Sequence, residues 1–253
     1  MIFDNPDKSW EKLGKTDPYY GVITVDKFRA GKLDEANRLE FFSQGRSHMA
    51  RILSCAESAT HRIARRRGLD FGCGVGRLVL PLATDAGFSE VVGIDISPSM
   101  LAEAARNASL AQVNNVRFVL GDDRLSQLEG TFDFIHSCIV LQHIPIRRGL
   151  EIIGGLLGRL SPGGVAALQM PFSRKVSWAR HVANQARVHV RPLHILANLI
   201  QGRPLQEPPM QMNLYNLNSV LQITHDRGIR RVTIDLASDG GNLGAYLFVQ
   251  KNR

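Results

Sequence analysis

The chain has 253 residues, of which 44% are hydrophobic, a size and composition that suit one α/β domain carrying a lid or insert. It has no apolar run of about 18 residues and no signal-type stretch near its start, so we expect no transmembrane helix, no stable membrane insertion and a cytoplasmic location. Its three cysteines, Cys55, Cys73 and Cys138, form no CxxC pair or disulfide framework, and we expect no metal site.

The net charge of +8 is concentrated in one part of the chain. No acidic residue lies between Glu151 and Glu207, whereas seven basic residues do: Arg159, Arg174, Lys175, Arg180, Arg187, Arg191 and Arg203. A local excess of positive charge attracts anions such as phosphates, acidic lipids or nucleic acid. Otherwise, such a charged surface only aids solubility.

The N-terminal part divides into two expected segments. Residues 1–33 mix Gly, Pro and charge, and we expect an extended lead-in. Residues 34–60 show apolar residues near helical spacing, with Gly45 placed to break them into two helices. We therefore expect an N-terminal lid and helices over residues 1–66.

Residues 67–253 alternate between strand-like and helix-like patterns, interrupted by a basic, proline-containing insert at 171–215 on the acceptor side. The expected strands are 68–71, 91–95, 116–120, 132–137, 165–170, 232–236 and 245–250, and the expected helices are 78–84, 99–108, 147–160 and 219–227. Strands alternating with helices predict right-handed crossovers and a Rossmann-like α/β fold. The short loop 237–244 makes the last strand antiparallel, in a mostly parallel seven-stranded sheet with helices on both faces.

A glycine-rich turn follows the first expected strand in Asp70-Phe71-Gly72-Cys73-Gly74-Val75-Gly76. Glycine lets a backbone approach a ligand closely, and we expect backbone N–H groups and a helix N-terminus to face that ligand. Asp70 suits a cationic ammonium group. A dinucleotide-binding protein is the first competitor, but its GxGxxG spacing is not the GxGxG found here.

Acidic residues also end the next two expected strands. Asp95 ends the second and is placed to accept hydrogen bonds from ribose hydroxyls. Asp122 and Asp123 end the third, where a carboxylate can accept from an adenine amine and a backbone N–H can reach a ring nitrogen.

These motifs, together with the Phe132-Asp133 strand and the Leu160-Ser161-Pro162-Gly163-Gly164 turn, resemble the class I S-adenosylmethionine (SAM)-dependent methyltransferase family. The resemblance implies SAM as the cofactor and S-adenosylhomocysteine as its product. It also implies specific cofactor contacts. Gly72, Gly74, Gly76 and Ser137 would lie near the methionine part, Asp95 at the ribose, and Ile96, Met100, Asp122 and Asp123 at the adenine.

Three further residues have weaker support. Tyr20 is expected to cover the cofactor as part of the lid, and Arg46 to meet the cofactor's carboxylate. His143 follows the fourth strand and resembles a general base of some small-molecule and sugar O-methyltransferases in that family, although it is equally consistent with a packing role.

The function favoured by the sequence is SAM-dependent methyl transfer to a hydroxyl of a small molecule, such as a sugar, glycan or glycolipid. An RNA methyltransferase that uses the basic insert is an alternative, although the aromatic content of 7% is low for RNA binding. A third possibility is a non-catalytic binding protein of the same fold.

Overall fold

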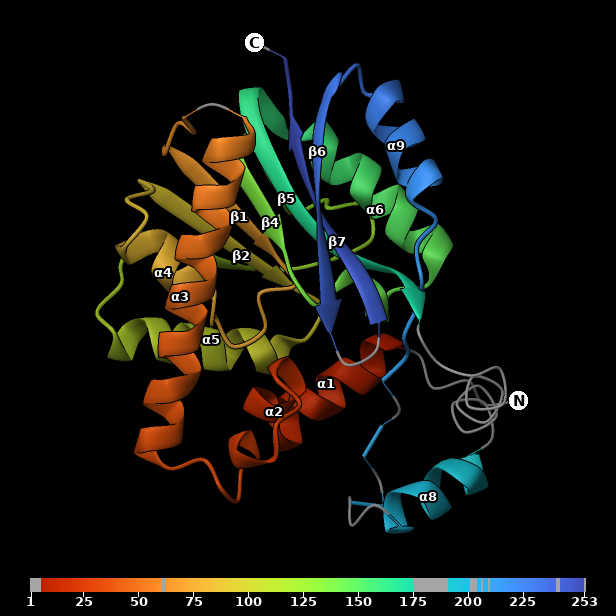
Figure 1. The fold of residues 1–253 in the computed structure, drawn as a ribbon. Helices are drawn as coiled ribbons and strands as arrows, with labels where there is room; N and C mark the ends of the chain where they lie inside the picture. The colour runs from red at the N-terminus through yellow and green to blue at the C-terminus, as the bar shows by residue number, and fades with distance from the viewer. Residues whose placement is uncertain are drawn as a thin grey trace.

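The computed structural model describes residues 6–60, 62–174, 191–200, 204–205, 207–208, 210–239 and 242–252. Its centre is a seven-stranded sheet in the order β3-β2-β1-β4-β5-β7-β6. The first five strands pair in parallel, and β7 is antiparallel to both β5 and β6. The predicted Rossmann-like fold with one antiparallel strand near the end is confirmed (Figure 1).

The strands are β1 (Arg67–Phe71), β2 (Glu90–Asp95), β3 (Val116–Leu120), β4 (Phe132–Ser137), β5 (Leu160–Arg174), β6 (Arg231–Asp239) and β7 (Asn242–Gln250). The helices are α1 (Pro6–Thr16), α2 (Pro18–Val22), α3 (Glu35–Ala59), α4 (Val79–Thr84), α5 (Pro98–Leu110), α6 (Ile146–Gly158), α8 (Arg191–Ile200) and α9 (Leu217–Asp226), with 3-10 turns η1 (Asp26–Phe28) and η2 (Leu141–His143). None of these helices is both long and apolar enough to cross a membrane.

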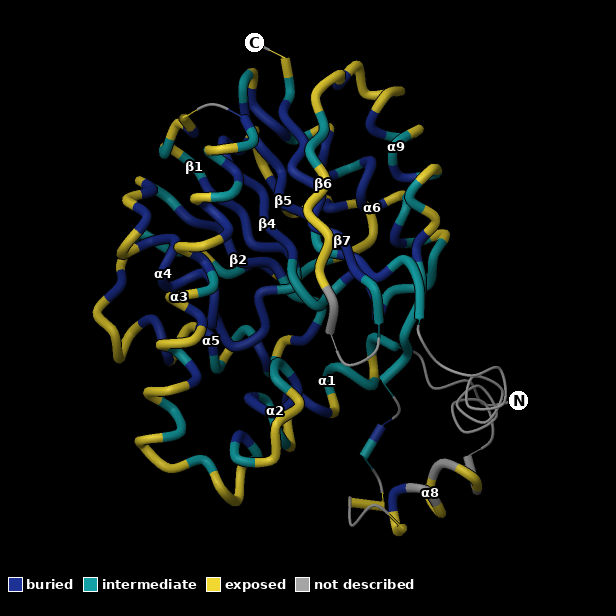
Figure 2. Tube along the Cα trace, in the orientation of Figure 1, coloured by how far each residue is buried: buried dark blue, intermediate teal, exposed yellow. Residues whose placement is uncertain are grey.

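The central strands are buried between two helical layers, whereas the edge strand β6 is largely exposed, as Figures 1 and 2 show. One hydrophobic cluster joins the sheet to α6 and α9 through residues such as Ile153, Leu156 and Val220. The other joins it to α3, α4 and α5 through Ile52, Leu82 and similar residues. Burial on both faces explains why the central strands read as nearly continuous apolar runs.

The N-terminal 33 residues are not an extended lead-in as predicted, because α1, α2 and η1 lie within them. Leu13 on α1 and Phe28 in η1 are buried in a third hydrophobic cluster. Figure 1 places α1 and α2 below the sheet, at the end where β5 finishes. The interrupted pattern concealed two short helices whose stability depends on tertiary packing rather than on length.

Gly45 does not break the helical segment in two, because α3 runs unbroken from Glu35 to Ala59. A Cβ atom at Gly45 would lie 2.7 Å from the carbonyl oxygen of Arg77. The glycine is therefore required for close packing of α3 against the turn that follows β1, and the helix tolerates its poor helix propensity of about 1 kcal/mol.

The C-terminal hairpin and the insert also differ from expectation. The predicted loop 237–244 is shorter, since β6 extends to Asp239 and β7 starts at Asn242. β5 extends to Arg174, so the first residues of the predicted insert continue the sheet. Lys175, Arg180, Arg187 and Arg203 of the basic stretch lie outside the described residues.

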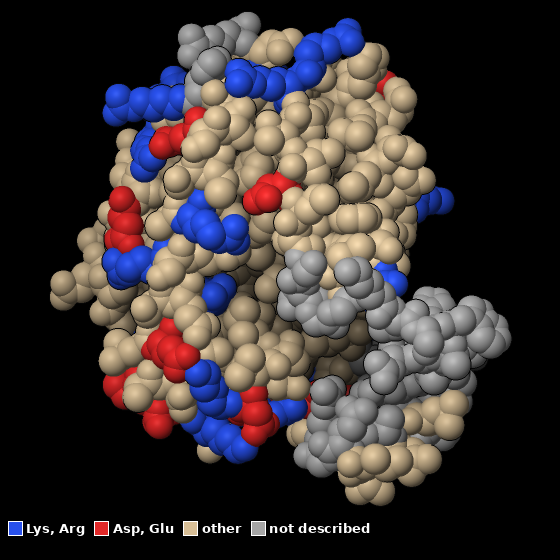
Figure 3. Space-filling model, in the orientation of Figure 1, with Lys and Arg blue, Asp and Glu red and all other residues tan. Residues whose placement is uncertain are grey.

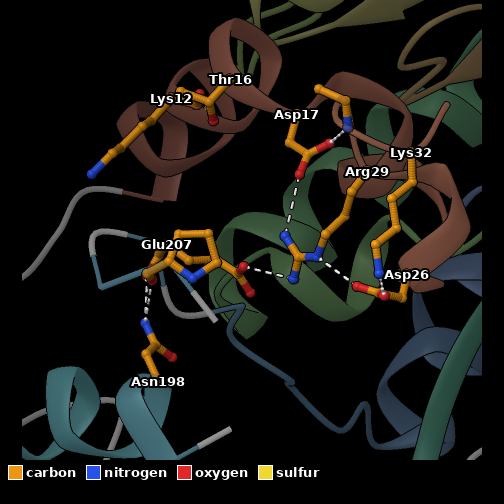
Figure 4. Close-up of polar contacts among 10 residues, drawn as sticks. Lys12, Thr16, Asp17, Asp26, Arg29, Lys32, Asn198 and Glu207 are labelled. Carbon is orange, nitrogen blue, oxygen red and sulfur yellow. Dashed lines mark hydrogen bonds and ion pairs between the residues drawn. The ribbon is translucent and has the colours of Figure 1, made fainter. Parts of the chain in front are cut away.

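Arg29 joins the lid to the end of the insert (Figure 4). Its guanidinium donates to Asp17 at 3.2 Å, to Asp26 at 3.1 Å and to Glu207 at 2.8 Å. The same guanidinium lies 3.5 Å above the ring of Tyr20. Because the Arg29 side chain is only 17% exposed, these contacts are partly shielded from solvent and hold two distant segments together.

Tyr215 anchors the segment that follows α8 to the body of the domain. Its hydroxyl donates to the carbonyl of Leu141 at 2.9 Å, and its backbone N–H donates to Pro171 at 2.8 Å. A Cβ at Gly149 on α6 would lie 1.8 Å from the Tyr215 hydroxyl. Glycine at 149 therefore makes room for a fully buried tyrosine.

Gly149→Ala should lower the free energy of unfolding by about 1–3 kcal/mol, because overpacking exceeds the roughly 1 kcal/mol of helix propensity that alanine gains. Gly154→Ala in the same helix is the control, since its nearest atom is the mobile end of Arg227 at 3.3 Å. Denaturant unfolding measures both. Equal stability of the two variants would contradict this account of Gly149.

Candidate active site

A cavity opens at the carboxyl end of the parallel strands, between the turns that follow β1, β2, β3 and β4 and the helix α1. Its volume is about 1090 Å³ including the open mouth. Figure 3 shows a hollow in the lower half of the visible face. The carboxyl edge of an open α/β sheet is where such folds bind ligands.

Most of the residues predicted to bind the cofactor line this cavity. They are Asp70, Gly72, Cys73, Gly74, Asp95, Ile96, Met100, Asp122 and Asp123, and the predicted base His143 joins them. Four others do not line it: Tyr20, Arg46, Gly76 and Ser137.

The glycine-rich turn after β1 shapes the cavity floor. Gly72, Gly74 and Gly76 all have positive φ, at 76°, 52° and 85°. A Cβ at Gly72 would meet the Val140 side chain at 2.3 Å, so this position needs glycine for space as well as for backbone conformation.

The backbone N–H groups of this turn do not face the cavity as predicted. Those of Gly72 and Cys73 both donate to the carbonyl of Ile94, and that of Gly74 donates to the Asp95 carboxylate at 2.9 Å. The following helix, α4, starts only at Val79. These three N–H groups are thus held by bonds within the protein, and the turn offers a ligand close approach of the backbone.

Asp95 connects two of the turns that form the cavity. One carboxylate oxygen accepts from the Gly74 N–H and the other from the Ser97 N–H, each at 2.9 Å. Burial raises the pKa of Asp95 above its ordinary value, and these two hydrogen bonds offset part of that rise. A carboxylate fixed in this way has lone pairs left for the hydroxyl groups of a ribose.

One end of the cavity is closed by an ion-pair cluster. Arg148 on α6 donates to Asp123 at 2.6 and 2.8 Å and to Asp7 on α1 at 3.2 Å. The Asp122 carboxylate accepts from the backbone N–H and hydroxyl of Ser126, and these hydrogen bonds lower its pKa. Asp122 therefore orders its own turn, whereas Asp123 joins that turn to α6.

The other end of the cavity is lined by one carboxylate and one guanidinium. Asp70 is 2% exposed and its carboxylate lies 2.8 Å from Nδ1 of His136. Arg77 is 8% exposed and donates through Nε to the carbonyl of Phe41 at 3.2 Å. Burial lowers the pKa of Arg77, but an arginine remains charged at any ordinary pH. Together these groups match a zwitterionic amino-acid head.

The four predicted residues outside the cavity have other partners. Arg46 is 64% exposed and pairs with Asp85 at 2.7 Å, remote from the cavity lining. Tyr20 is buried beneath Arg29. The Ser137 hydroxyl donates to the carbonyl of Phe71 at 3.1 Å, and Gly76 packs against Ala104.

His143 lies in the cavity wall in a defined tautomer. Its Nδ1 must donate to the carbonyl of Gln211, 2.7 Å away, so Nε2 carries the lone pair of the neutral ring. The side-chain nitrogen of Gln142 lies 3.3 Å from Nε2, and the ring of Trp10 packs edge-on at 5.0 Å. Burial lowers the pKa of His143 to about 4.

Sequence reasoning missed several lining residues. Trp10 and Asp7 were hidden because α1 was not expected, and Arg148 because it lies within an ordinary helical pattern. Arg77 directly follows Gly76, so its position next to the turn was a usable signal. These residues bring the apolar, cationic and acidic groups that complete the cavity.

Comparison with known proteins agrees with this geometry. Residues 69–164 match the methyltransferase-domain family. The chain is 38% identical over 103 residues to a trans-aconitate 2-methyltransferase of Deinococcus radiodurans, covering 41% of this chain and 37% of that protein. It is 31% identical over 140 residues to the Escherichia coli protein of the same name, covering 52% and 53%. The matches thus span about half or less of these relatives' length.

Solved structures share the fold over more of the chain. The magnesium protoporphyrin IX methyltransferase of Synechocystis, with SAM bound, superposes with a TM-score of 0.60 at 18% identity and covers 98% of each chain. A Haemonchus contortus phosphoethanolamine N-methyltransferase superposes with a TM-score of 0.60 at 16% identity, covering 81% of this chain and 53% of that one.

The fold and the cavity define a protein that binds a nucleoside cofactor at the carboxyl edge of a Rossmann-like sheet. The sequence match over residues 69–164 and the shared fold indicate a class I SAM-dependent methyltransferase domain, for which SAM is the cofactor. The cavity fits that molecule: Asp95 suits the ribose, Ile96 and Met100 offer apolar surface for the adenine, and the Asp70 and Arg77 charges match the methionine head.

Asp95→Ala should weaken SAM binding at least fivefold, about 1 kcal/mol, because it removes a charge-assisted hydrogen bond to the ribose. Asp95→Asn, which keeps one oxygen acceptor, should fall between this variant and the wild type. Asp235→Ala, on the exposed part of β6, is the control. Titration calorimetry measures the SAM affinity of each variant. An unchanged dissociation constant for Asp95→Ala would show that Asp95 does not contact the ribose.

Arg77→Met should weaken SAM binding at least tenfold, since it removes the cation that lies with Asp70 at the end of the cavity suited to the methionine head. Arg46→Met should leave the affinity within about twofold, because an exposed surface ion pair such as Arg46–Asp85 contributes little. The same calorimetric titration measures both variants. If Arg46→Met weakened SAM binding more than Arg77→Met did, Arg46 would be the residue that contacts the carboxylate.

Proposed function

We propose that this protein methylates an oxygen atom of a small organic acid, forming a methyl ester and S-adenosylhomocysteine. The observation that carries this proposal is the burial of His143 in the cavity wall, which holds its pKa near 4. A carboxylate is already ionised at neutral pH and attacks without losing a proton. A hydroxyl must lose its proton during attack, and a histidine of such low pKa accepts one poorly.

Two further findings support an anionic acceptor. The matching relatives are named for trans-aconitate, which is the anion of a carboxylic acid. The seven basic residues between Glu151 and Glu207 follow β4 in the chain and give this half a positive charge that attracts anions.

The residues of this chain act mainly by positioning. Bound SAM supplies a methyl group activated on a sulfonium. Asp70 and Arg77 would orient the methionine head and Asp95 would hold the ribose, which would make the activated methyl group available to an acceptor. Trp10 and α1 cover the cavity and exclude water. Alignment of this kind can supply roughly 7–11 kcal/mol of the barrier.

Methyl transfer to a hydroxyl, as on a sugar, glycan or glycolipid, is the second candidate. One observation favours it: Nδ1 of His143 donates to Gln211, which leaves Nε2 as the proton acceptor that a general base needs. Gln142 can then orient the ring through its contact at Nε2.

An RNA acceptor and a non-catalytic role have less support. Figure 3 shows basic and acidic side chains interspersed along the left of the visible face, whereas an RNA surface would need a continuous basic track. A non-catalytic protein would not need Asp70, Arg77 and Asp95 brought together around a cavity of cofactor size.

The deciding experiment uses methyl-labelled SAM with a panel of di- and tricarboxylic acids, sugars and RNA. Methyl esters release labelled methanol in mild alkali, whereas methyl ethers and methylated RNA bases do not. Alkali-labile label on an acid supports the proposal. Alkali-stable label on a sugar or on RNA would replace it with the corresponding alternative.

His143→Gln tests the role of the imidazole in the same assay. With a carboxylate acceptor, turnover should stay within about threefold of wild type, because no proton is transferred. With a hydroxyl acceptor, turnover should fall about 10²–10⁴-fold. SAM affinity, measured by calorimetry, should be unchanged and shows that the variant is folded.

A further inference from the structure

Three side chains of the kinds that bind metal ions lie beside the cavity, between α3 and the end of β4. The members of this cluster are His48 on α3, His136 on β4 and Cys138 just after β4. One nitrogen of each histidine and the Cys138 sulfur all lie within 4.8 Å of one another. The methyl-transfer chemistry described above uses none of these three groups.

His136 is the strongest indication of a missing partner. Its side chain is fully buried, yet its Nε2 has no hydrogen-bond partner. A buried polar atom left unpaired costs about 1–3 kcal/mol, so proteins rarely keep one without a ligand, a water or an ion. Nε2 is the ring nitrogen that remains available to a ligand, because Nδ1 already pairs with Asp70.

Asp70 fixes His136 in the form that binds a metal. Its carboxylate lies 2.8 Å from Nδ1 of His136, so the ring proton sits on Nδ1 and the lone pair on Nε2. A carboxylate behind a histidine is the usual second partner of a metal-ligating imidazole, where it sets the tautomer and raises the basicity of the ligand.

The remaining neighbours supply an oxygen donor and set the charge. The Tyr246 hydroxyl lies 3.0 Å from Nε2 of His48 and also hydrogen-bonds Cys138. Arg51 and Arg77 act electrostatically on His48. The Asp70 carboxylate and a Cys138 thiolate together carry two negative charges, equal in size to the charge of a divalent cation.

We propose that His48, His136 and Cys138 bind one divalent transition-metal ion of the zinc class. Two imidazoles and a thiolate are the donor set that such ions prefer over calcium or magnesium. Bonds of about 2.0–2.3 Å would place the ligand atoms roughly 3.3–3.8 Å from one another, so atoms now within 4.8 Å would have to approach by at most about 1.5 Å. Binding replaces the Cys138 thiol proton, which passes to solvent.

The ion would act as a clamp between the N-terminal helices and the sheet. His48 lies in the middle of α3, whereas His136 lies near the end of β4 and Cys138 directly follows that strand. Cys138 also lines the cavity, so the clamp would fix the wall next to the methionine head of the cofactor. This contradicts the expectation from cysteine spacing that the chain has no metal site.

Cobalt(II) titration of the chelator-treated, tag-free chain tests the proposal. We expect one Co²⁺ per chain, with a near-ultraviolet thiolate-to-cobalt charge-transfer band and the intense visible bands of a four-coordinate ion. Cys138→Ser should abolish the charge-transfer band, and His136→Asn and His48→Asn should each weaken binding at least tenfold. Cys55→Ser and His225→Asn, which change residues outside the cluster, should bind as the wild type does.

Two measurements keep the test independent of variant folding. Cd²⁺ added to the unmodified chain should give a thiolate–cadmium band, and Zn²⁺ in hundredfold excess over its dissociation constant should raise the wild-type melting temperature by roughly 5–10 °C. Absence of stoichiometric Co²⁺ binding to the wild type would overturn the proposal. So would a charge-transfer band that survives in Cys138→Ser or disappears in Cys55→Ser.

Discussion

The Asp95 carboxylate is the contact on which the rest of the site depends. Its two oxygens accept from the N–H of Gly74 and the N–H of Ser97, and so join the turn after β1 to the start of α5. The same Ser97 caps α5 by accepting from the Met100 N–H at 3.1 Å. One buried carboxylate therefore aligns two turns and a helix before any ligand arrives. That preorganisation keeps the ordering cost of cofactor binding low.

The N-terminal helices close this site through charge rather than through apolar surface alone. Glu11 on α1 accepts from the hydroxyls of Ser97 and Ser99, each at 2.8 Å. Burial raises the pKa of Glu11, but these hydrogen bonds outweigh it and lower the pKa to about 2. The bonds are therefore complete above the ordinary glutamate pKa and are lost only as the pH falls toward 2. Across the neutral range the lid stays attached to the turn that holds Asp95.

The sequence predicted best where an apolar strand lies next to a recognisable motif. The bounds of β3 and β4 matched residue for residue, and the acidic residues at the strand ends do meet at one cavity. Prediction failed where long-range packing decides the outcome. Gly45 indicated a helix break, yet it exists to let the Arg77 backbone approach α3. Arg46 had the right chemistry, but it lies on an exposed face of α3, and a buried arginine beside the glycine turn lines the cavity instead.

The insert that follows β5 also determines the chemistry at the cavity wall. Its last residues, Gln211 and Asn213, bond to η2: the Gln211 carbonyl holds Nδ1 of His143, and the Asn213 N–H donates to the Gln142 carbonyl at 2.7 Å. Tyr215 then ties this segment to the Leu141 carbonyl. The tautomer and the burial of His143 are therefore set by a segment about 70 residues away in the chain. A change in the insert that loosened these bonds would expose the ring, return its pKa toward 6.5 and make it a stronger base. Under the function proposed above, the strength of His143 as a base thus depends on how tightly this segment covers η2.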